Sequence, residues 1–295
     1  MSASFEAQFN NSDRPHVVMV TNHGIHEWKV DAGLPDTGGQ NVYVNQLSAT
    51  LRRLGFRVTV YNRGGYAQPK SGKLRSGTHY RNGEERLTYL EDSRNEFIRK
   101  EDMFPQIEEL AEDLARQLRS APRPVLLVSH YWDGAAISDK ALRELGMSIP
   151  HVWIPHSLGA LKKEGTPEAQ WKELRLEERI STEEQLLRRV SLVGATSQAM
   201  RRTLAEAHGV TEALFLPPCV DEQRFNLQAA RDESALELLS EATGLSEQEI
   251  REARIITEVS RTDRTKRKDV LIEAFARVRH KHPEALLAVT IDPGA

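Results

Sequence analysis

Short apolar runs alternate with longer segments of helical spacing along most of the chain. The run HVVMVTN, which begins at His16, has the length and composition of a buried strand. The segment from about Gly39 to Leu54 then repeats leucine at Leu47 and Leu51, and Gly55 ends it as glycine commonly ends a helix. Strands in turn with helices predict an α/β fold, a parallel sheet with helices on both faces. Further strands are expected at 56–62, 86–91, 124–130, 151–156, 190–196 and 212–217, helices at 100–119 and 133–145, and a loop or exposed hairpin at 67–85.

The alternation of strands and helices is interrupted at LPPCVDEQRFN, where two prolines indicate a linker. A helical segment is expected at 232–251, with a capping box of Ser246 and Glu249 at the start of its second helix. A strand, a helix and a strand follow. Because so few elements cannot bury a core of their own, we expect a second α/β domain that is incomplete in this chain. The predicted divisions are an N-terminal domain at 1–216, a linker and helical segment at 217–252, and the start of a C-terminal domain at 253–295.

Composition narrows the possible partners. The 295 residues are 39% hydrophobic and 28% charged, with a net charge of −3, so nothing indicates a surface for nucleic acid or membrane. No apolar run approaches the ~20 residues of a membrane span, and the N-terminus lacks the pattern of a secretory signal. Cys219 is the only cysteine, which suits a reducing compartment. We expect a cytoplasmic protein with small-molecule partners, and the sequence leaves its oligomeric state open.

The segment DTGGQ, from Asp36 to Gln40, leads directly into the first predicted helix. Unpaired N–H groups and the helix dipole favour an anion at such a position, and glycine lets a phosphate approach the backbone closely. The segment is neither GxGxxG nor a P-loop, because it lacks the lysine. The residues alone leave two interpretations open. Gly38 and Gly39 form an anion site, or they only make a tight turn with Asp36 or Thr37 as the helix cap.

Two histidines stand at the ends of predicted strands. His130 closes the strand at 124–130 and His156 closes the strand at 151–156. Ligands of open parallel sheets bind beyond the carboxyl ends of the strands, so both are candidate site residues. The alternative is that they are packed histidines. In the same way, the basic segment RTDRTKRK, which follows the strand at 253–261, is either a phosphate site or a solvated loop.

Seven segments, read in order, resemble one known family. They are PDTGGQNVYV at 35–44, SHYWDGA at 129–135, PHSLGALKKE at 155–164, RISTEEQLL at 179–187, ATSQAM at 195–200, LPPCVDEQRF at 216–225 and SRTDRTKRKDVLIEAFA at 260–276. Together they resemble the retaining GT-B glycosyltransferases, in particular the branch of sucrose synthase and sucrose-phosphate synthase. The resemblance covers nearly the whole chain and implies a GT-B fold with a Rossmann-like N-terminal domain and the start of a second one. Cys219 stands where that family usually has glycine.

The resemblance also implies a site for the diphosphate of a nucleotide-sugar donor. Gly38 and Gly39 would offer backbone N–H groups to it, with Gln40 nearby. Arg261 and Lys266, from the second domain, would neutralise the same diphosphate as it leaves. Preorganised amides and basic side chains would then stabilise the charge that develops in the transition state. No metal or other cofactor is therefore expected.

His156 is implied to lie beside the transferred sugar, near the reacting carbon, and to form the catalytic set with Arg261 and Lys266. Retention without an obvious enzymic nucleophile is expected of this family, so none is assigned. The Glu-x7-Glu motif of the family would lie beyond Ala295. We therefore expect the chain to be part of a longer protein, with half of its donor site present.

The acceptor side is implied to be lined by His130 and Asp133. Basic side chains at positions that match a sugar-phosphate site in the family are Lys162 and Arg179, with Arg99 or Lys100 as a further candidate. These residues favour a phosphorylated acceptor, whereas the spelling PDTGGQ favours unphosphorylated fructose.

The sequence thus predicts a retaining transferase that moves a hexose, glucose in the first place, from a nucleoside diphosphate to a sugar or a sugar phosphate such as fructose 6-phosphate. One alternative is transfer to another compatible-solute acceptor. Another is a non-catalytic protein that binds sugar phosphates.

Overall fold

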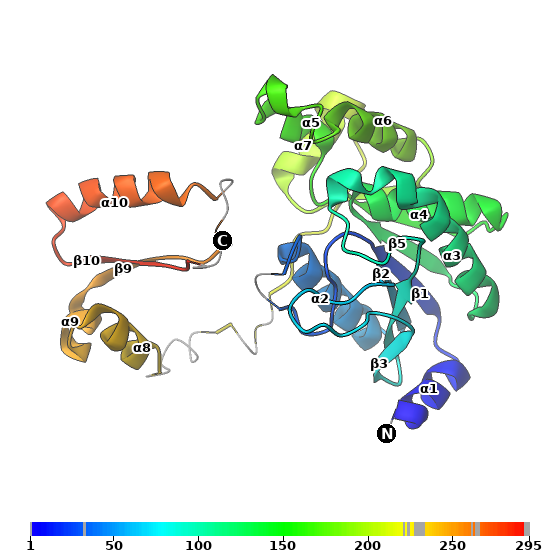
Figure 1. The fold of residues 1–295 in the computed structure, drawn as a ribbon, viewed down its shortest axis with the longest axis horizontal. Coiled ribbons are helices and arrows are strands. Elements are labelled where there is room, and N and C mark those ends of the chain that lie inside the picture. Colours follow the sequence, from blue (N-terminus) through cyan, green and yellow to red (C-terminus); the bar gives the residue numbers. More distant parts are fainter. Residues whose placement is uncertain are drawn as a thin grey trace. The chain divides into compact units, whose positions relative to one another are not determined.

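The structure is a computed structural model that describes residues 2–31, 34–220, 222, 225–226, 234–260, 262 and 266–291. The chain divides into two compact units, Met1–Cys219 and Val220–Ala295. Each unit has its own sheet, and each is considered separately (Figure 1). In the described residues, no helix has both the length and the apolar character needed to cross a membrane.

The first unit is built on an eight-stranded sheet with the order β3-β4-β2-β1-β5-β6-β7-β8. Neighbouring strands are parallel except for β3 and β4, which form an antiparallel hairpin at one edge. The predicted α/β class with a parallel sheet is therefore confirmed, and β3 lies in the segment predicted as a loop or hairpin. The strands are β1 His16–Thr21, β2 Arg57–Arg63, β3 Thr78–Asn82, β4 Glu85–Leu90, β5 Leu126–His130, β6 His151–Ile154, β7 Leu192–Ala195 and β8 Leu214–Phe215.

Helices cover both faces of this sheet, as the continuous apolar runs of the strands require. Val18 and Val20 of β1 pack with α3 and α4 in one core cluster. Val17 and Met19, which alternate with them, pack with α2 in a second cluster on the opposite face. The helices are α1 Ser2–Asn11, α2 Gly39–Arg53, α3 Ile107–Ser120, α4 Tyr131–Glu144, α5 Gly159–Glu164, α6 Leu176–Leu187 and α7 Gln198–His208, with short 3₁₀ turns η1 Lys100–Asp102, η2 Phe104–Gln106 and η3 Glu168–Gln170.

Several predicted boundaries are wrong for local reasons. The helix expected at 100–119 is two 3₁₀ turns followed by α3, because Pro105 lies at the start of η2 and a proline inside a helix removes one of its hydrogen bonds. The helix α4 begins at Tyr131 rather than at Asp133. The strand β6 ends at Ile154, before Pro155, so His156 lies beyond the strand and not on it. The helix α1 had no counterpart in the sequence analysis.

The second unit contains helices and a two-stranded sheet. Its elements are α8 Ser234–Thr243, α9 Glu247–Glu252, β9 Arg254–Glu258, α10 Lys268–Lys281 and β10 Ala285–Val289. The capping box of Ser246 and Glu249 is confirmed at the start of α9, and β9 pairs with β10 in parallel. Apolar side chains of this unit are open to solvent, including Ile255 and Ile256, each 40% exposed.

Candidate active site

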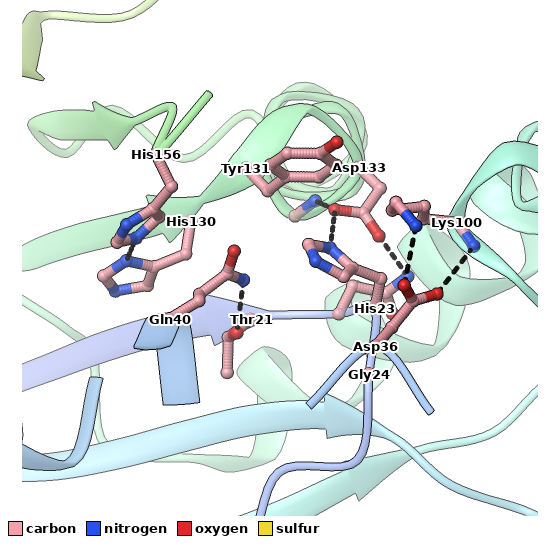
Figure 2. A network of polar contacts seen from close by, with 12 residues as sticks. Thr21, His23, Gly24, Asp36, Gln40, Lys100, His130, Tyr131, Asp133 and His156 are labelled. Atoms are coloured by element: carbon pink, nitrogen blue, oxygen red, sulfur yellow. Dashed lines mark hydrogen bonds and ion pairs between the residues drawn. The ribbon is translucent and has the colours of Figure 1, made fainter. Parts of the chain in front are cut away.

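The candidate site lies at the carboxyl edge of the first unit's sheet. The strand order reverses between β1 and β5, and this is the position at which doubly wound sheets bind their ligands. The chain leaves β1 through Asn22 and His23, and it leaves β5 directly into α4 at His130. The N-terminus of α2 and the turn after β6 reach the same edge (Figure 2).

The glycine turn caps α2 through the backbone. Gly38 precedes the helix, its N–H group donates to Asn41 Oδ1 at 2.8 Å, and Asn41 N–H donates to the Gly38 carbonyl at 3.0 Å. The N–H groups of Gly39 and Gln40 have no acceptor among the described residues. One of the two interpretations had Asp36 or Thr37 as the helix cap, and that part of it is wrong. Asp36 pairs with Lys100, and the Thr37 hydroxyl bonds to the backbone of Ile25 instead.

The space around the two glycines differs from that around a structural glycine. A Cβ at Gly24, which has φ +74°, would lie 2.3 Å from the Asp36 carbonyl oxygen, so only glycine fits there. A Cβ at Gly38 or Gly39 would meet nothing within 4 Å, and neither residue has a left-handed φ. Within the described chain no packing or left-handed backbone requires glycine at these two positions, and the space before them is open to a ligand.

His130 and His156, the histidine pair, lie in contact at this edge (Figure 2). His130 Nδ1 is 2.9 Å from His156 Nε2, and the two rings stack with centroids 5.2 Å apart. The Tyr43 ring meets the edge of the His156 ring at 4.9 Å. Burial lowers the pKa of His156 to about 3, and it holds the pKa of His130 well below its usual value. The pair is therefore neutral at physiological pH.

His156 has a strained backbone. Its φ is +56°, and Ser157 N–H donates to the Pro155 carbonyl across it at 2.6 Å, which closes a three-residue turn. Residues other than glycine rarely adopt positive φ, and those that do concentrate at functional sites. Asp36 at φ +49° and Tyr131 at φ +65° lie at the same edge. Three of the five such residues found in the described chain thus surround the candidate site.

Asp133 is fully buried at the first turn of α4. Its carboxylate accepts bonds from Asn22 Nδ2 at 3.2 Å and from Gly134 N–H at 2.8 Å, and it lies 3.3 Å from His23 Nδ1. The His23 ring packs against Tyr131 at 4.2 Å. Asn22 and His23 were missed by the sequence analysis. The rule that singled out His130, a polar residue at the end of a predicted strand, applies equally to Asn22, and His23 follows it directly.

Four charged residues form a second cluster, the ion-pair group of Asp36, Lys100, Glu101 and Lys162. Lys100 Nζ lies 2.6 Å from Asp36 Oδ1 and 3.2 Å from Glu101 Oε1, and Lys162 Nζ lies 3.4 Å from Glu101 Oε1. Burial opposes the charge of Lys100, yet Asp36 holds its pKa above the usual value. Burial lowers the pKa of Lys162. Two cations and two carboxylates balance here, so an incoming phosphate would compete with Asp36 and Glu101.

Arg179 differs from the other predicted acceptor residues, because its guanidinium is buried and surrounded by protein partners. Its Nε bonds to Glu183 at 2.7 Å, its Nη1 to the Tyr131 hydroxyl at 2.5 Å and its Nη2 to the Ser157 carbonyl at 2.7 Å. The residue is 3% exposed and Glu183 is 0% exposed. Glu183 was not singled out in the sequence analysis, although RISTEEQLL contains both residues.

The remaining predicted residues are placed as follows. Gln40 turns its side-chain amide to Thr21 Oγ1 at 3.0 Å, beside the histidine pair (Figure 2). Arg261 lies outside the described residues. Lys266 belongs to the second unit, where its side chain is exposed. Arg99 is exposed and pairs with Asp102 at 3.1 Å. No cluster of three or more His, Cys, Asp or Glu side chains that could hold a metal occurs among the described residues. The expected absence of a metal stays a prediction.

Comparison with known proteins decides the family. The sequence profile described as Glycosyltransferase Family 4 matches residues 37–224. The chain belongs to glycosyltransferase family 4. This family 4 chain is 27% identical over 287 residues to a mannosylfructose-phosphate synthase from Agrobacterium fabrum, an alignment that covers 94% of the chain and 59% of the relative. It is also 27% identical to a D-inositol 3-phosphate glycosyltransferase from Corynebacterium jeikeium, with 89% of the chain and 59% of the relative covered. It therefore spans somewhat more than half the length of these relatives.

The structure of this family 4 chain is similar to that of the sucrose-phosphate synthase from Thermosynechococcus elongatus. The TM-score is 0.76 at 23% identity, with 96% of this chain and 64% of the other covered. At that identity the likeness shows the fold. The predicted resemblance to GT-B glycosyltransferases of the sucrose-phosphate synthase branch is confirmed, and so is the GT-B fold.

Proposed function

We propose that the protein is a retaining glycosyltransferase that moves a hexose from a nucleoside diphosphate sugar to a phosphorylated sugar. The observation that carries this proposal is the neutral histidine pair beside a helix N-terminus with two free N–H groups. An uncharged imidazole can hydrogen-bond a sugar hydroxyl, and the free N–H groups suit the diphosphate that leaves.

The donor side uses the N-terminus of α2. Gly39 and Gln40 would donate their N–H groups to diphosphate oxygens, whereas the Gly38 N–H is held by Asn41 and would contribute through its open space alone. His156 would face the transferred sugar. Arg261 and Lys266 would stabilise the departing diphosphate as its charge grows, with no metal required.

The acceptor side uses the ion-pair group together with Asp133. Lys162, assisted by Lys100, would bind the acceptor phosphate in exchange for their present carboxylate partners. Both relatives, a mannosylfructose-phosphate synthase and a D-inositol 3-phosphate glycosyltransferase, are named for a phosphorylated compound. That shared feature supports a phosphorylated acceptor over free fructose.

The hexose itself has two candidates. Glucose, with fructose 6-phosphate as acceptor, follows from the sucrose-phosphate synthase resemblance. Mannose is favoured by the relative named for mannosylfructose phosphate, whose alignment covers nearly all of this chain. Both transfers build the same kind of product, a phosphorylated disaccharide.

The test is an assay of the longest protein that the gene encodes, with glucose and mannose donors crossed against fructose 6-phosphate, inositol 3-phosphate and fructose. We expect turnover with a phosphorylated acceptor, retention at the anomeric carbon by NMR of the product, and no loss of rate in EDTA. An inverted anomeric carbon in the product would contradict the retaining mechanism. Binding of fructose 6-phosphate with no product from any donor would favour the sugar-phosphate-binding protein instead.

A further inference from the structure

Three side chains hold the turn that carries His156. His130 and Arg179 were predicted to contact the acceptor, and Glu183 was not predicted as a site residue. The strain in that turn needs support, because a positive φ at a residue other than glycine persists only where its surroundings enforce it. The supports are His130, which contacts the ring, and the Arg179–Glu183 pair, which contacts the backbone.

The backbone support comes from helix α6. Arg179 Nη2 donates to the Ser157 carbonyl at 2.7 Å, immediately after His156. Glu183 accepts the N–H of Gly159 at 2.8 Å, two residues further along, at the start of α5. Arg179 and Glu183 bond to one another at 2.7 Å. One buried ion pair therefore fixes both sides of the segment that follows His156.

The ring support comes from His130. Its Nε2 is buried and has no partner among the described residues, while its Nδ1 meets His156 Nε2. A buried ring nitrogen without a partner is tolerated more easily as a lone pair than as an N–H group. We therefore assign the proton of His130 to Nδ1, which donates to His156. His156 then carries its own proton on Nδ1, which has no partner in the described part of the chain.

We propose that His130, Arg179 and Glu183 are positioning residues that together hold His156 in its turn with Nδ1–H directed to the substrate, and that Arg179 does not bind the acceptor phosphate. The proposal deepens the proposed function and rests on it only where turnover is concerned. Each of the three Arg179 nitrogens already has a protein partner and the residue is 3% exposed, so a phosphate could reach its remaining N–H groups only if the side chains that cover them moved.

The decisive variant is the double substitution Arg179→Met and Glu183→Gln, which removes both buried charges at once and leaves the glutamine oxygen for Gly159 N–H. Glu184→Gln, an exposed neighbour on α6, is the matched control. Ring signals of His156 in the 295-residue chain are identified by their loss in His156→Gln. In the parent chain we expect the Nδ1–H tautomer and no titration between about pH 5 and 8.

In the double variant we expect the turn to relax and His156 to titrate near its ordinary value of about 6.5. A His156 signal that stays unchanged while the protein remains folded would overturn the proposal. An Nε2–H tautomer in the parent chain would overturn the part played by His130. If the double variant does not fold, Arg179→Lys, which keeps the charge but loses the planar fork, is measured in the same way.

Kinetics separate positioning from phosphate binding. We expect kcat to fall about 100-fold in the double variant, with KM for the phosphorylated acceptor changed by less than about threefold. A KM rise of about tenfold or more at unchanged kcat would mean that Arg179 holds the phosphate. If the protein transfers no sugar at all, the proposed function fails, and the NMR result still decides whether His156 is held in this way.

Discussion

The histidine pair and the ion-pair group lie at the same edge of one sheet and differ in almost every physical respect. His130 and His156 are neutral, stacked and largely shielded from solvent, whereas the ion-pair group, exemplified by Lys100 with Asp36, keeps full charges in partly exposed positions. Figure 2 shows the histidine pair on one side of His23 and Asp133, and Asp36 with Lys100 on the other. One edge thus offers an uncharged hydrogen-bonding surface beside a charged one, an arrangement that would suit the phosphorylated sugar proposed as acceptor.

Replacing His156 by alanine removes one ring of the neutral histidine pair, and it has the largest expected effect on turnover. Removal of a positioned hydrogen-bonding group at a reacting centre commonly costs a factor of about 10² to 10⁴. We therefore expect kcat to fall by about 10³, measured on the longest encoded protein, and the unfolding midpoint to fall as well, because the substitution leaves Nδ1 of His130 without its partner. His280→Ala on α10, an exposed histidine of the second unit, is the control. If the His156→Ala variant kept its turnover, the proposed role of His156 beside the transferred sugar would be wrong.

Gly39→Ala tests whether the open space before α2 belongs to a ligand. The added methyl meets nothing in the described chain, and alanine suits a helix better than glycine, so stability should hold or rise slightly. If a diphosphate approaches the backbone there, kcat/KM for the donor should fall by about 10- to 100-fold. Thermal unfolding and donor kinetics on one preparation give both numbers. Unchanged donor kinetics would leave the two glycines as a turn only.

The substitution Lys162→Met changes the ion-pair group and leaves the histidine pair intact. Its ammonium is the cation of the ion-pair group with the weaker carboxylate contact, so it is the one most easily recruited by a phosphate. We expect KM for a phosphorylated acceptor to rise about tenfold, as for the loss of one charge-assisted hydrogen bond, with donor KM unchanged. The neighbour Lys163, which pairs with the exposed Glu177 at 3.4 Å and lies over the Trp171 ring at 4.2 Å, gives the matched control Lys163→Met. Equal effects of both substitutions would argue against a specific phosphate contact.

Acid should destabilise the fold through the buried neutral histidines, of which His130 is one, and this is the smallest effect expected per residue. Burial lowers the pKa of His26 to about 3 and of His16 and His151 to about 4, and it holds that of His130 well below its usual value. The unfolded chain takes up protons on these residues below about pH 6.5 while the folded chain does not, so stability is full above that pH and is lost as pH falls towards 4.

Each histidine contributes up to about 1.4 kcal/mol per pH unit in that window. Urea unfolding at several pH values measures the slope, and His151→Gln should reduce it. A flat profile between about pH 6.5 and 4.5 would contradict the buried neutral state. Asp36, whose carboxyl pKa Lys100 holds below its usual value, should stay ionised through the same window.

The sequence predicted the neutral side of the site better than the charged side, for a physical reason. His130 lies at a strand end, and strand ends follow from the apolar runs. The contact between Lys100 and Asp36 depends on how two distant loops meet, which no local pattern encodes. The burial of Arg179 was equally hidden, because a basic residue on a helix suggests an exposed face until the partner on the next turn, Glu183, is seen to be buried with it.

In the second unit, local sequence patterns predicted the secondary structure but not the site. Its strands, helices and capping box follow from the sequence, since they depend on spacing and caps. Lys266, which was predicted to be a site residue, is exposed in this unit, and Arg261 lies outside the described residues. The proposed roles of both therefore rest on the resemblance alone.

The strand order of the first unit also has a consequence for the order of folding. The strand β1 lies between β2 and β5, so Val17 pairs with Val58 on one side and with Leu126 on the other. Such distant pairings form slowly, because the intervening chain must be ordered before they contribute. During synthesis the ribosome must release α6 before His156 gains its support from Arg179. A nascent chain that stops short of Glu183 can already hold the central strands, yet it lacks a formed site.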